Sequence, residues 1–378
     1  MALAAGAHFF NDAMGNVYPV LVPLLMGPLH IGLVFAALIS SAHRLTQNLL
    51  QPVFGGISDR AGPLSRLLPA ALAVGAVATG LLPFAGSGWV LLALAVAGGI
   101  TGGAFHPPAM AWVRALSGSR SGRGQAIFGM GGNLGRALSP LILAAVAVWA
   151  GTRSVSLLAL AALALGLLYL AQAPGRAQSR RSSPAPAGRA RDLFRGRSAA
   201  TAALLAMIAA FGTMSGAILI LVPVAYRIEG QPVYLGAVVV SVMLLAGSFG
   251  NGLGGLLSDV VARERVAVIA AVASTAALVG FVFSHGLLSL VLAALTGWFS
   301  MSTNAMAVVM CQDLFPDSIA MASGLASGLG SAGGTLIVAL LALVAGATSV
   351  TLALLIAGGV GLLAIPAVIA ARRWHPAR

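Results

Sequence analysis

Long apolar stretches, separated by short polar or Gly/Pro-containing breaks, follow one another along the whole chain. A helix of about 20 residues crosses the ~30 Å apolar core of a bilayer. Apolar residues are continuous within each stretch, whereas the strands of a membrane β-barrel would alternate apolar and polar positions. The pattern predicts an all-α membrane protein with twelve transmembrane helices. These helices are expected at 2–25, 32–57, 66–85, 89–113, 124–150, 154–173, 199–224, 234–257, 266–284, 288–311, 319–345 and 350–370.

The longest polar interruption is rich in arginine, serine and proline and divides the helices into two sets of six. We therefore expect an N-terminal six-helix bundle at 1–173, a basic cytoplasmic linker at 174–198 and a C-terminal six-helix bundle at 199–378. The halves also repeat, because Gly55-Gly56-Ile57-Ser58-Asp59 matches Gly255-Leu256-Leu257-Ser258-Asp259 at an offset of 200 residues. Internal repeats of this kind predict two pseudo-symmetric bundles, which is the usual construction of secondary transporters.

Composition agrees with a membrane protein, since 59% of the residues are hydrophobic and 8% are charged. A soluble globular protein has roughly 25% charged residues, so a water-soluble enzyme is excluded. All 21 basic residues are arginine, and the net charge is +13. Seventeen arginines fall on one set of alternate loops and termini, whereas the other side has Arg153 and Arg227. By the positive-inside rule, both termini and the linker are expected in the cytoplasm, which places the chain in the cell inner membrane.

Few residues offer enzymatic chemistry. Lysine is absent, Cys311 is the single cysteine, and no nucleotide-binding loop or Ser-His-Asp spacing occurs. We therefore expect no enzyme activity, no metal site, no cofactor and no nucleic-acid partner. The first apolar stretch begins at Ala2 and holds His8 and Asp12, so it is interpreted as the first span and not as a signal peptide.

The loop after the second predicted helix carries Gly55, Asp59, Arg60, Gly62 and Arg66. This run resembles the signature of the major facilitator superfamily. The resemblance implies two six-helix bundles around a central cavity, with Gly55, Asp59 and Arg60 forming a conformational latch at the cytoplasmic helix ends. Asp259 belongs to the second copy, which is degraded because Val260 stands where arginine is expected. A tight turn without a latching role is the alternative.

Further runs narrow the resemblance to the fosmidomycin-resistance type of facilitator. They are His8 with Asn11-Asp12, Gln51-Pro52, Phe105-His106-Pro107, Gly131-Gly132-Asn133-Leu134-Gly135, and Gln312-Asp313-Leu314-Phe315-Pro316. The resemblance implies a drug-resistance efflux antiporter that is proton-coupled. Pro108 stands where family members commonly have an acid, which weakens the transfer of proton coupling and of the drug substrate.

Three charged residues lie within predicted spans at about the same depth: Asp12, Arg44 and Arg136. A charge at mid-bilayer costs ~2.5–3.5 kcal/mol on insertion scales and usually faces a cavity or a partner. The net charge of these two arginines and one aspartate is +1. If the aspartate forms an ion pair with one arginine, the other guanidinium has no carboxylate partner. We expect that arginine to bind an anionic group of the substrate. The alternative is that helix carbonyls, Asn133, Gln47 or water satisfy it.

The histidines have different predicted roles. His8 precedes Asp12 by one helical turn, so the two can share a face as a proton relay or as a structural hydrogen bond. His43 is interpreted as a packing residue. His106 lies beside Pro107 and Pro108, where a broken helix could line the cavity. A structural role is favoured for His106.

Two glycine runs occupy corresponding predicted spans, at 129–135 and 328–334. They lie inside apolar helices and lack the strand and lysine of a phosphate-binding loop. Close packing of helices that slide during a conformational change explains them better.

Together these features predict a secondary active transporter that exports a small organic solute, anionic in character, or a drug by alternating access. The proton gradient is expected to drive it. Proton-coupled uptake of an organic anion is the alternative within this class, and a membrane-embedded sensor without transport is the alternative outside it. The chain is expected to act as a monomer in the lipid bilayer. The nearly uncharged second half is expected to provide apolar walls, with Phe211, Met214, Met243 and Asn304 as candidates.

The arginine distribution yields a test of topology. Reporter proteins fused to the N-terminus and to the C-terminus should both signal a cytoplasmic location. A periplasmic signal from the C-terminal fusion would show that the number of spans is odd.

Overall fold

The computed structural model describes residues 2–61, 67–117, 121–172, 197–315, 322 and 324–372, and all regular secondary structure in them is helical. The chain divides into two compact units. Unit 1 comprises Met1–Ala185 and Pro232–Ala237, and unit 2 comprises Pro186–Gln231 and Val238–Arg378. Nearly all of the predicted linker at 174–198 lies outside the described residues.

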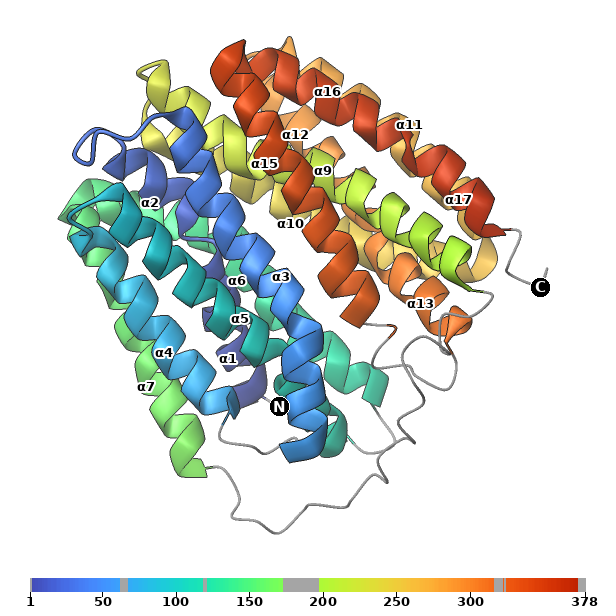
Figure 1. The fold of residues 1–378 in the computed structure, drawn as a ribbon, viewed down its shortest axis with the longest axis horizontal. Helices are drawn as coiled ribbons and strands as arrows, with labels where there is room; N and C mark the ends of the chain where they lie inside the picture. Colours follow the sequence, from blue (N-terminus) through green and yellow to red (C-terminus); the bar gives the residue numbers. More distant parts are fainter. Residues whose placement is uncertain are drawn as a thin grey trace. The chain divides into compact units, whose positions relative to one another are not determined.

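Unit 1 holds the six helical segments predicted for the first half, with some of them divided (Figure 1). Its helices are α1 (Ala2–Gly15), α2 (Tyr18–Leu25), α3 (Leu33–Ala61), α4 (Leu67–Leu81), η1 (Leu82–Phe84), α5 (Gly88–Ser117), α6 (Ser121–Ala150), η3 (Thr152–Val155) and α7 (Ser156–Gln172).

Unit 2 has the corresponding order of segments. Its helices are α9 (Ser198–Ile228), α10 (Val233–Val260), α11 (Arg263–Val282), α12 (Gly286–Ser302), α13 (Asn304–Leu314), the π-helical turn η4 (Leu325–Gly330), α15 (Ser331–Ala347), α16 (Val350–Leu362) and α17 (Ala364–Arg372). The first residues of α10 group with unit 1.

The first predicted helix, 2–25, is interrupted between α1 and α2. Pro19 has no N–H, so it cannot bond to the carbonyl of Gly15 four residues earlier. At the end of α1, the Asn16 side chain donates a hydrogen bond from Nδ2 to the Asp12 carbonyl oxygen at 3.0 Å. The proline thus ends α1 just after its polar residues.

Two further interruptions occur in unit 2. The predicted helix 288–311 divides into α12 and α13 at Thr303, where Asn251 Oδ1 accepts a hydrogen bond from the Ala305 N–H at 3.0 Å. The predicted helix 350–370 divides at Leu363, because Pro366 cannot donate to the carbonyl of Leu362.

The break anticipated at Pro107 and Pro108 does not occur, because α5 continues through both residues. Its glycine face lies directly on α3, where a Cβ added at Gly103 would come within 2.8 Å of the Gln47 carbonyl. Packing of neighbouring helices therefore holds this prolyl segment helical.

Eight helices among the described residues are long and apolar enough to cross a membrane. They are Gly88–Met110, Ile127–Ala150, Ser198–Ile228, Val233–Gly255, Arg263–Val282, Gly286–Cys311, Leu325–Ala347 and Val350–Ala371. Leu68–Phe84 and Thr152–Gly166 are shorter apolar helices. The chain is a multi-pass membrane protein, and the count of twelve spans stays a prediction.

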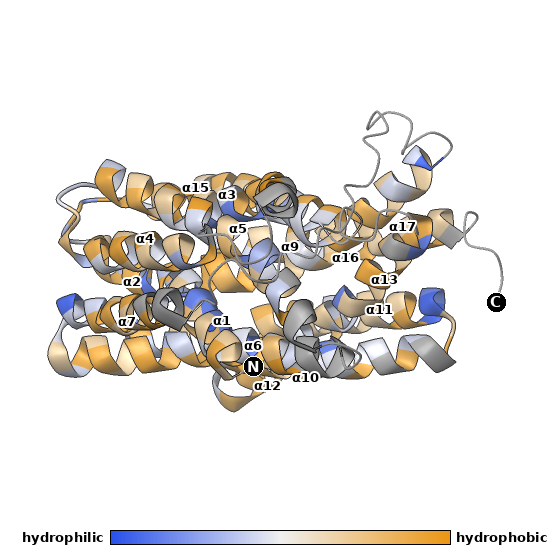
Figure 2. Ribbon diagram, turned by 90° about the horizontal axis from the view of Figure 1, so that it is seen from below, coloured by the Kyte–Doolittle hydropathy of each residue, from blue (hydrophilic) through white to orange (hydrophobic). Residues whose placement is uncertain are grey.

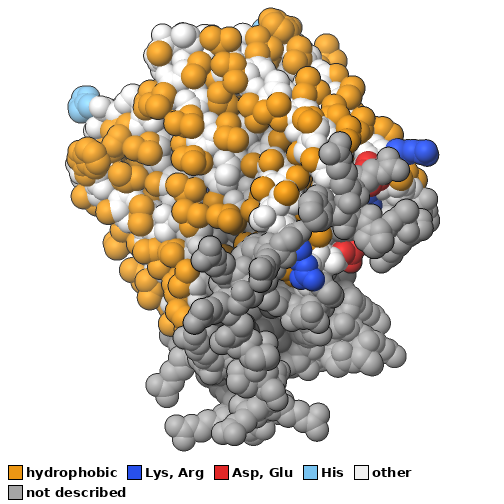
Figure 3. All heavy atoms as spheres, turned by 45° about the vertical axis from the view of Figure 1, so that its right-hand side comes forward, with side chains coloured by type: hydrophobic (Ala, Val, Ile, Leu, Met, Phe, Trp, Pro, Cys, Tyr) orange, Lys and Arg blue, Asp and Glu red, His pale blue; other side chains and the backbone are white. Residues whose placement is uncertain are grey.

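The surface is suited to lipid. Hydrophobic residues predominate along the helices in Figure 2 and cover most of the described part of the face in Figure 3. Trp89, at the start of α5, is 71% exposed, and Trp149, near the end of α6, is 89% exposed. Both tryptophans lie at helix ends assigned by the arginine distribution to the non-cytoplasmic side, as expected of an aromatic belt at the membrane interface.

Each unit packs its helices in the same pairs. In unit 1, α1 contacts α6 and α7, and α4 contacts α5 and α7. In unit 2, α9 contacts α15 and α16, and α11 contacts α12 and α16. The repeat detected in the sequence is therefore also a repeat of helix packing within each unit.

Glycines make the closest of these contacts possible. A Cβ added at Gly135 on α6 would overlap the carbonyl oxygen of Phe9 on α1. At the matching place in unit 2, a Cβ added at Gly334 on α15 would come within 2.8 Å of the Ala209 carbonyl on α9. Small residues at these positions let the helix backbones touch, as the glycine runs predict.

This close approach provides a stability test. Gly135→Ala should destabilise the protein by about 1–3 kcal/mol, because the added methyl group must push α6 away from α1. Gly129→Ala is the matched control on the same helix, since a Cβ there would meet nothing within 4 Å. Thermal unfolding in detergent would measure both variants. Equal melting temperatures would contradict the assigned α1–α6 contact.

Candidate functional site

The charged residue Asp12 lies on α1 inside unit 1 and is only 6% exposed. Arg136 on α6 places Nε 3.3 Å from Asp12 Oδ2. The same guanidinium donates from a terminal nitrogen to Asn133 Oδ1 at 2.7 Å, one turn earlier on α6. Asp12 is therefore paired with Arg136, and Asn133 holds the guanidinium in place.

His8 also contacts Asp12, with Nε2 3.4 Å from Oδ2. Its Nδ1 lies 2.8 Å from the carbonyl oxygen of Phe128, and the two rings stack with centroids 4.0 Å apart. A carbonyl can only accept, so Nδ1 carries a hydrogen and Nε2 faces the carboxylate. With Nδ1 as the donor to Phe128, Nε2 is the ring nitrogen that faces the Asp12 carboxylate.

His106 on α5 completes the cluster, because its Nε2 lies 3.5 Å from Asp12 Oδ1. Two side-chain amides contact the Asp12 carboxylate and the His106 ring. Asn11 donates from Nδ2 to Asp12 Oδ1 at 3.1 Å, and Gln47 Nε2 lies 3.3 Å from His106 Nε2. The structure places His106 directly against the carboxylate, and the structural role favoured for it from sequence stays a prediction.

Arg44 on α3 has no hydrogen bond or ion pair with another residue of the described ranges, although it lies within electrostatic reach of Asp12 and Arg136. Its side chain is partly buried. The structure therefore assigns the ion pair to Arg136 and leaves Arg44 as the unpaired guanidinium that the charge sum requires.

The ligand atoms of His8, Asp12 and His106 lie within 4.8 Å of one another, which is a grouping that could hold a metal ion. Arg136 already contacts the carboxylate, and Arg44 is nearby. Two guanidiniums beside one carboxylate oppose a bound metal cation, so the arrangement is better suited to binding an anion.

Comparisons with known proteins agree with this architecture. Residues 2–288 match the family model of the Major Facilitator Superfamily. The chain belongs to the major facilitator superfamily. It is 30% identical over 360 residues to the fosmidomycin resistance protein of Escherichia coli (strain K12), covering 92% of this chain and 86% of that one. It is 28% identical over 385 residues to the uncharacterized MFS-type transporter YfnC of Bacillus subtilis (strain 168), covering 97% and 93%.

Solved structures of major facilitators share the fold. The nucleoside transporter NupG, in a mutant form, superposes with a TM-score of 0.79 at 12% identity, covering 98% of this chain and 99% of that one. A D-xylose-proton symporter superposes with a TM-score of 0.76 at 14% identity, covering 98% and 96%. The chain is therefore a membrane transporter of this superfamily that acts on small molecules, and it is not an enzyme.

The predicted latch residues of this facilitator lie at the ends of α3 and α10, which extend to Ala61 and Val260. The side chains of Asp59, Arg60 and Asp259 and the surroundings of Gly55 are outside the described part of the chain, so the latch stays a prediction.

The candidate apolar walls of the second half stay a prediction, and the structure shows their contacts within unit 2. Met214 packs inside unit 2 against Gly361 and Thr275, and Met243 packs against Gly297. Phe211 is also buried, whereas Asn304 is exposed. The large apolar side chains stabilise the bundle interior because glycines on facing helices leave room for them.

Phe128 is a site residue that the sequence did not reveal. Phe128, Gly132 and Arg136 follow at intervals of four and therefore share one face of α6. A Cβ added at Gly132 would lie 2.8 Å from Asp12 Oδ2 and would overlap the His8 ring. The glycine at this position was the available signal, since it marks the face of α6 that approaches α1.

The pairing of Asp12 can be tested by stability. Arg136→Gln should destabilise the protein by about 1–3 kcal/mol, which is less than for a fully buried pair because the Arg136 side chain is 37% exposed. Arg44→Gln should have a smaller effect, since it breaks no contact among the described residues. Thermal unfolding in detergent would compare the two. A larger loss for Arg44→Gln would reverse the assignment.

Proposed function

We propose that this facilitator is a proton-coupled exporter of small, anionic organic solutes or drugs. In this proposal the protein works by alternating access in the inner membrane, as a monomer with both termini in the cytoplasm, and needs no cofactor besides the proton gradient. The Asp12 cluster beside the unpaired Arg44 carries the proposal of proton coupling and anion recognition, whereas export rests on the similarity to the fosmidomycin resistance protein.

Arg44 is the proposed contact for the anionic group of the solute. A guanidinium inside a bundle is costly without a partner, and its planar donors suit a carboxylate or phosphate-like group. Arg136 is less available, because Asp12 and Asn133 already hold it. The anionic group of the solute would thus pair with the positive charge of Arg44, which has no partner in the described residues.

Asp12 and His8 are the proposed carriers of the exchangeable proton, with His106 as their neighbour. The two groups lie 3.4 Å apart, and a proton bound by the carboxylate would neutralise it. Protonation would weaken the attraction between Asp12 and Arg136, which loosens the contact between α1 and α6. A proton could in this way bias the bundle toward another conformation.

Export is proposed because the similar protein of Escherichia coli is named for resistance to fosmidomycin, and removal of a drug from the cell is one route to resistance. Proton-coupled uptake is a second candidate, and the charge arrangement favours it. Protonation of Asp12 would leave two guanidiniums uncompensated, so a proton and an anion would bind best to the same state. The direction of coupling decides between the two.

The coupling can be measured in proteoliposomes with fosmidomycin as the first probe and small organic anions with their neutral esters as a panel. An exporter that exchanges solute for protons accumulates solute when the vesicle interior is acid. An uptake symporter accumulates it when the exterior is acid. Flux that is indifferent to an imposed pH gradient of either sign would overturn proton coupling.

Variants separate the two roles. Asp12→Asn should keep partial solute binding but remove the pH dependence of flux, because the titrating carboxylate is gone. Arg44→Gln should weaken anion binding by about 10–100-fold, the value of a hydrogen bond to a charged group, and Arg44→Lys should recover part of it. Arg153→Gln is the control, since Arg153 lies outside the cluster, over the Phe84 ring. Wild-type transport and pH response in all cluster variants would place the site elsewhere.

A further inference from the structure

Three polar residues form a stripe along α3 inside unit 1. Arg44 is followed by Asn48 and Gln51, at intervals of four and three residues that place side chains above one another on one face of a helix. All three residues are partly exposed. Polar side chains are rare within membrane helices and mark the paths of solutes and ions. We call Arg44, Asn48 and Gln51 the α3 stripe.

The α3 stripe points away from the apolar surface of the same helix. Leu49 and Val53 are 44% and 56% exposed, and they lie about 140° and about 180° round the helix from Arg44. The face that carries the stripe is buried over the two preceding turns, where Ala37 and Ser41 are 0% and 2% exposed. This face of α3 therefore becomes accessible at Arg44, on the side opposite the one suited to lipid.

The side chains of the α3 stripe have no partner in the part of the chain that the structure describes. Arg44 makes no hydrogen bond or ion pair there, and neither do the carboxamides of Asn48 and Gln51. A polar side chain inside a membrane is costly when nothing pairs with it. Three successive unpaired groups on one face thus indicate a surface that water or a solute contacts.

The second half shows what these positions do when their role is structural. At the repeat offset of 200 residues, Ser248 and Asn251 on α10 correspond to the two amides of the α3 stripe. Ser248 Oγ donates to the Leu244 carbonyl at 2.8 Å, and Asn251 Oδ1 accepts from the Ala305 N–H. Both side chains are engaged by the helices of unit 2, whereas their counterparts in unit 1 are left available.

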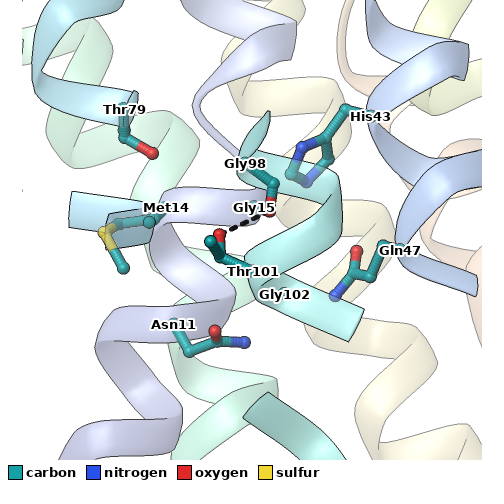
Figure 4. Close-up of a pocket in the computed structure, with 10 residues that line it drawn as sticks. Asn11, Met14, Gly15, His43, Gln47, Thr79, Gly98, Thr101 and Gly102 are labelled. Atoms are coloured by element: carbon teal, nitrogen blue, oxygen red, sulfur yellow. Dashed lines mark hydrogen bonds between the residues drawn. The ribbon is translucent and has the colours of Figure 1, made fainter. Parts of the chain in front are cut away.

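The other polar residues of α3 lie on its side toward α5. His43 and Gln47 line a small cavity between α1, α3, α4 and α5 (Figure 4). Its volume of about 10 Å³ is close to the space that one water molecule requires. Gln47 also contacts His106. An organic solute cannot enter so small a space, so a solute that meets α3 would contact the α3 stripe.

The spacing of the stripe sets requirements on a ligand. A helix rises 1.5 Å per residue, so Asn48 and Gln51 lie about 6 Å and about 10 Å along α3 from Arg44. Each carboxamide offers two N–H donors and one carbonyl acceptor. A ligand whose anionic group pairs with Arg44 would therefore need hydrogen-bonding groups along its body. An apolar tail would leave both amides without a partner, which costs affinity.

We propose that Asn48 and Gln51 are specificity-determining residues, which bind the polar body of an organic anion held by Arg44. The solute class is an anion whose chain carries hydroxyl, carbonyl or amide groups, as opposed to an anion with an apolar tail. This inference rests on the proposed role of Arg44 and deepens it, because it assigns the part of the solute that is not charged.

Gluconate and hexanoate are matched probes, since both are six-carbon monocarboxylates and only gluconate carries hydroxyl groups along its chain. Calorimetry in detergent should show wild-type protein binding gluconate about tenfold more tightly or better, as two hydrogen bonds would give. Asn48→Leu and Gln51→Met should each lower this preference by about 2–10-fold, the range for one hydrogen bond between neutral groups. Leu49→Met is the control on the lipid-facing side of α3 and should keep the preference.

The outcomes separate this inference from the proposed function. Wild-type protein that binds gluconate no better than hexanoate would overturn the assigned solute class. A preference that survives in Asn48→Leu and Gln51→Met would overturn the role of the two amides. Arg44→Gln should weaken the binding of both probes. Unaltered affinities in Arg44→Gln would instead count against the proposed anion contact itself.

The orientation of the α3 stripe can be measured without a solute. Cys311 is buried and is the single cysteine, so Cys311→Ala provides a background without thiols. In that background and in a lipid bilayer, Asn48→Cys and Gln51→Cys should react with a negatively charged thiol reagent, because water reaches them. Leu49→Cys should react at least about tenfold more slowly, because an apolar setting suppresses the thiolate. Equal rates at the three positions would contradict the assigned orientation.

Discussion

The burial of one carboxylate inside a membrane bundle is the constraint around which unit 1 is organised. An unpaired Asp12 at this position would be costly, because the surroundings cannot solvate its charge. The structure surrounds it with Arg136, His8, His106 and the amide of Asn11. These partners come from three helices, so the carboxylate links α1, α5 and α6 at one point. A change in its protonation would be felt by all three helices.

Glycine makes this arrangement sterically feasible. Asp12 can reach Arg136 because Gly132 has no side chain to stand between α1 and α6, and Gly135 lets the backbones touch one turn further on. Such helix faces associate stably in lipid, because close backbone packing takes the place of the hydrophobic effect that drives helix association in water. The electrostatic cluster and the glycine contacts are therefore two parts of the same interface.

The two units share their packing but not their chemistry. His43 corresponds to Met243, because each lies against a glycine of a neighbouring helix. A Cβ added at Gly99 would overlap the His43 carbonyl, and a Cβ added at Gly297 would overlap the Met243 carbonyl. At the repeat offset of 200 residues, His8 and Asp12 correspond to Ile208 and Gly212, and Arg44 corresponds to Leu244. The second copy has thus kept the helix contacts while losing the titratable groups. This asymmetry concentrates the candidate coupling residues in unit 1.

The sequence determined those features that depend on composition and on helical periodicity. Apolar length predicted the helices, the offset of 200 residues predicted a repeat, and the spacing of His8 and Asp12 predicted a shared face. The tertiary structure decided which arginine meets Asp12. The sequence predicts Arg44 and Arg136 at similar depth, and the choice depends on how each helix is rotated about its axis, which the Gly132 contact sets for α6. It also brought His106 to the carboxylate and opened the cavity at His43, because both depend on contacts between helices far apart in the chain.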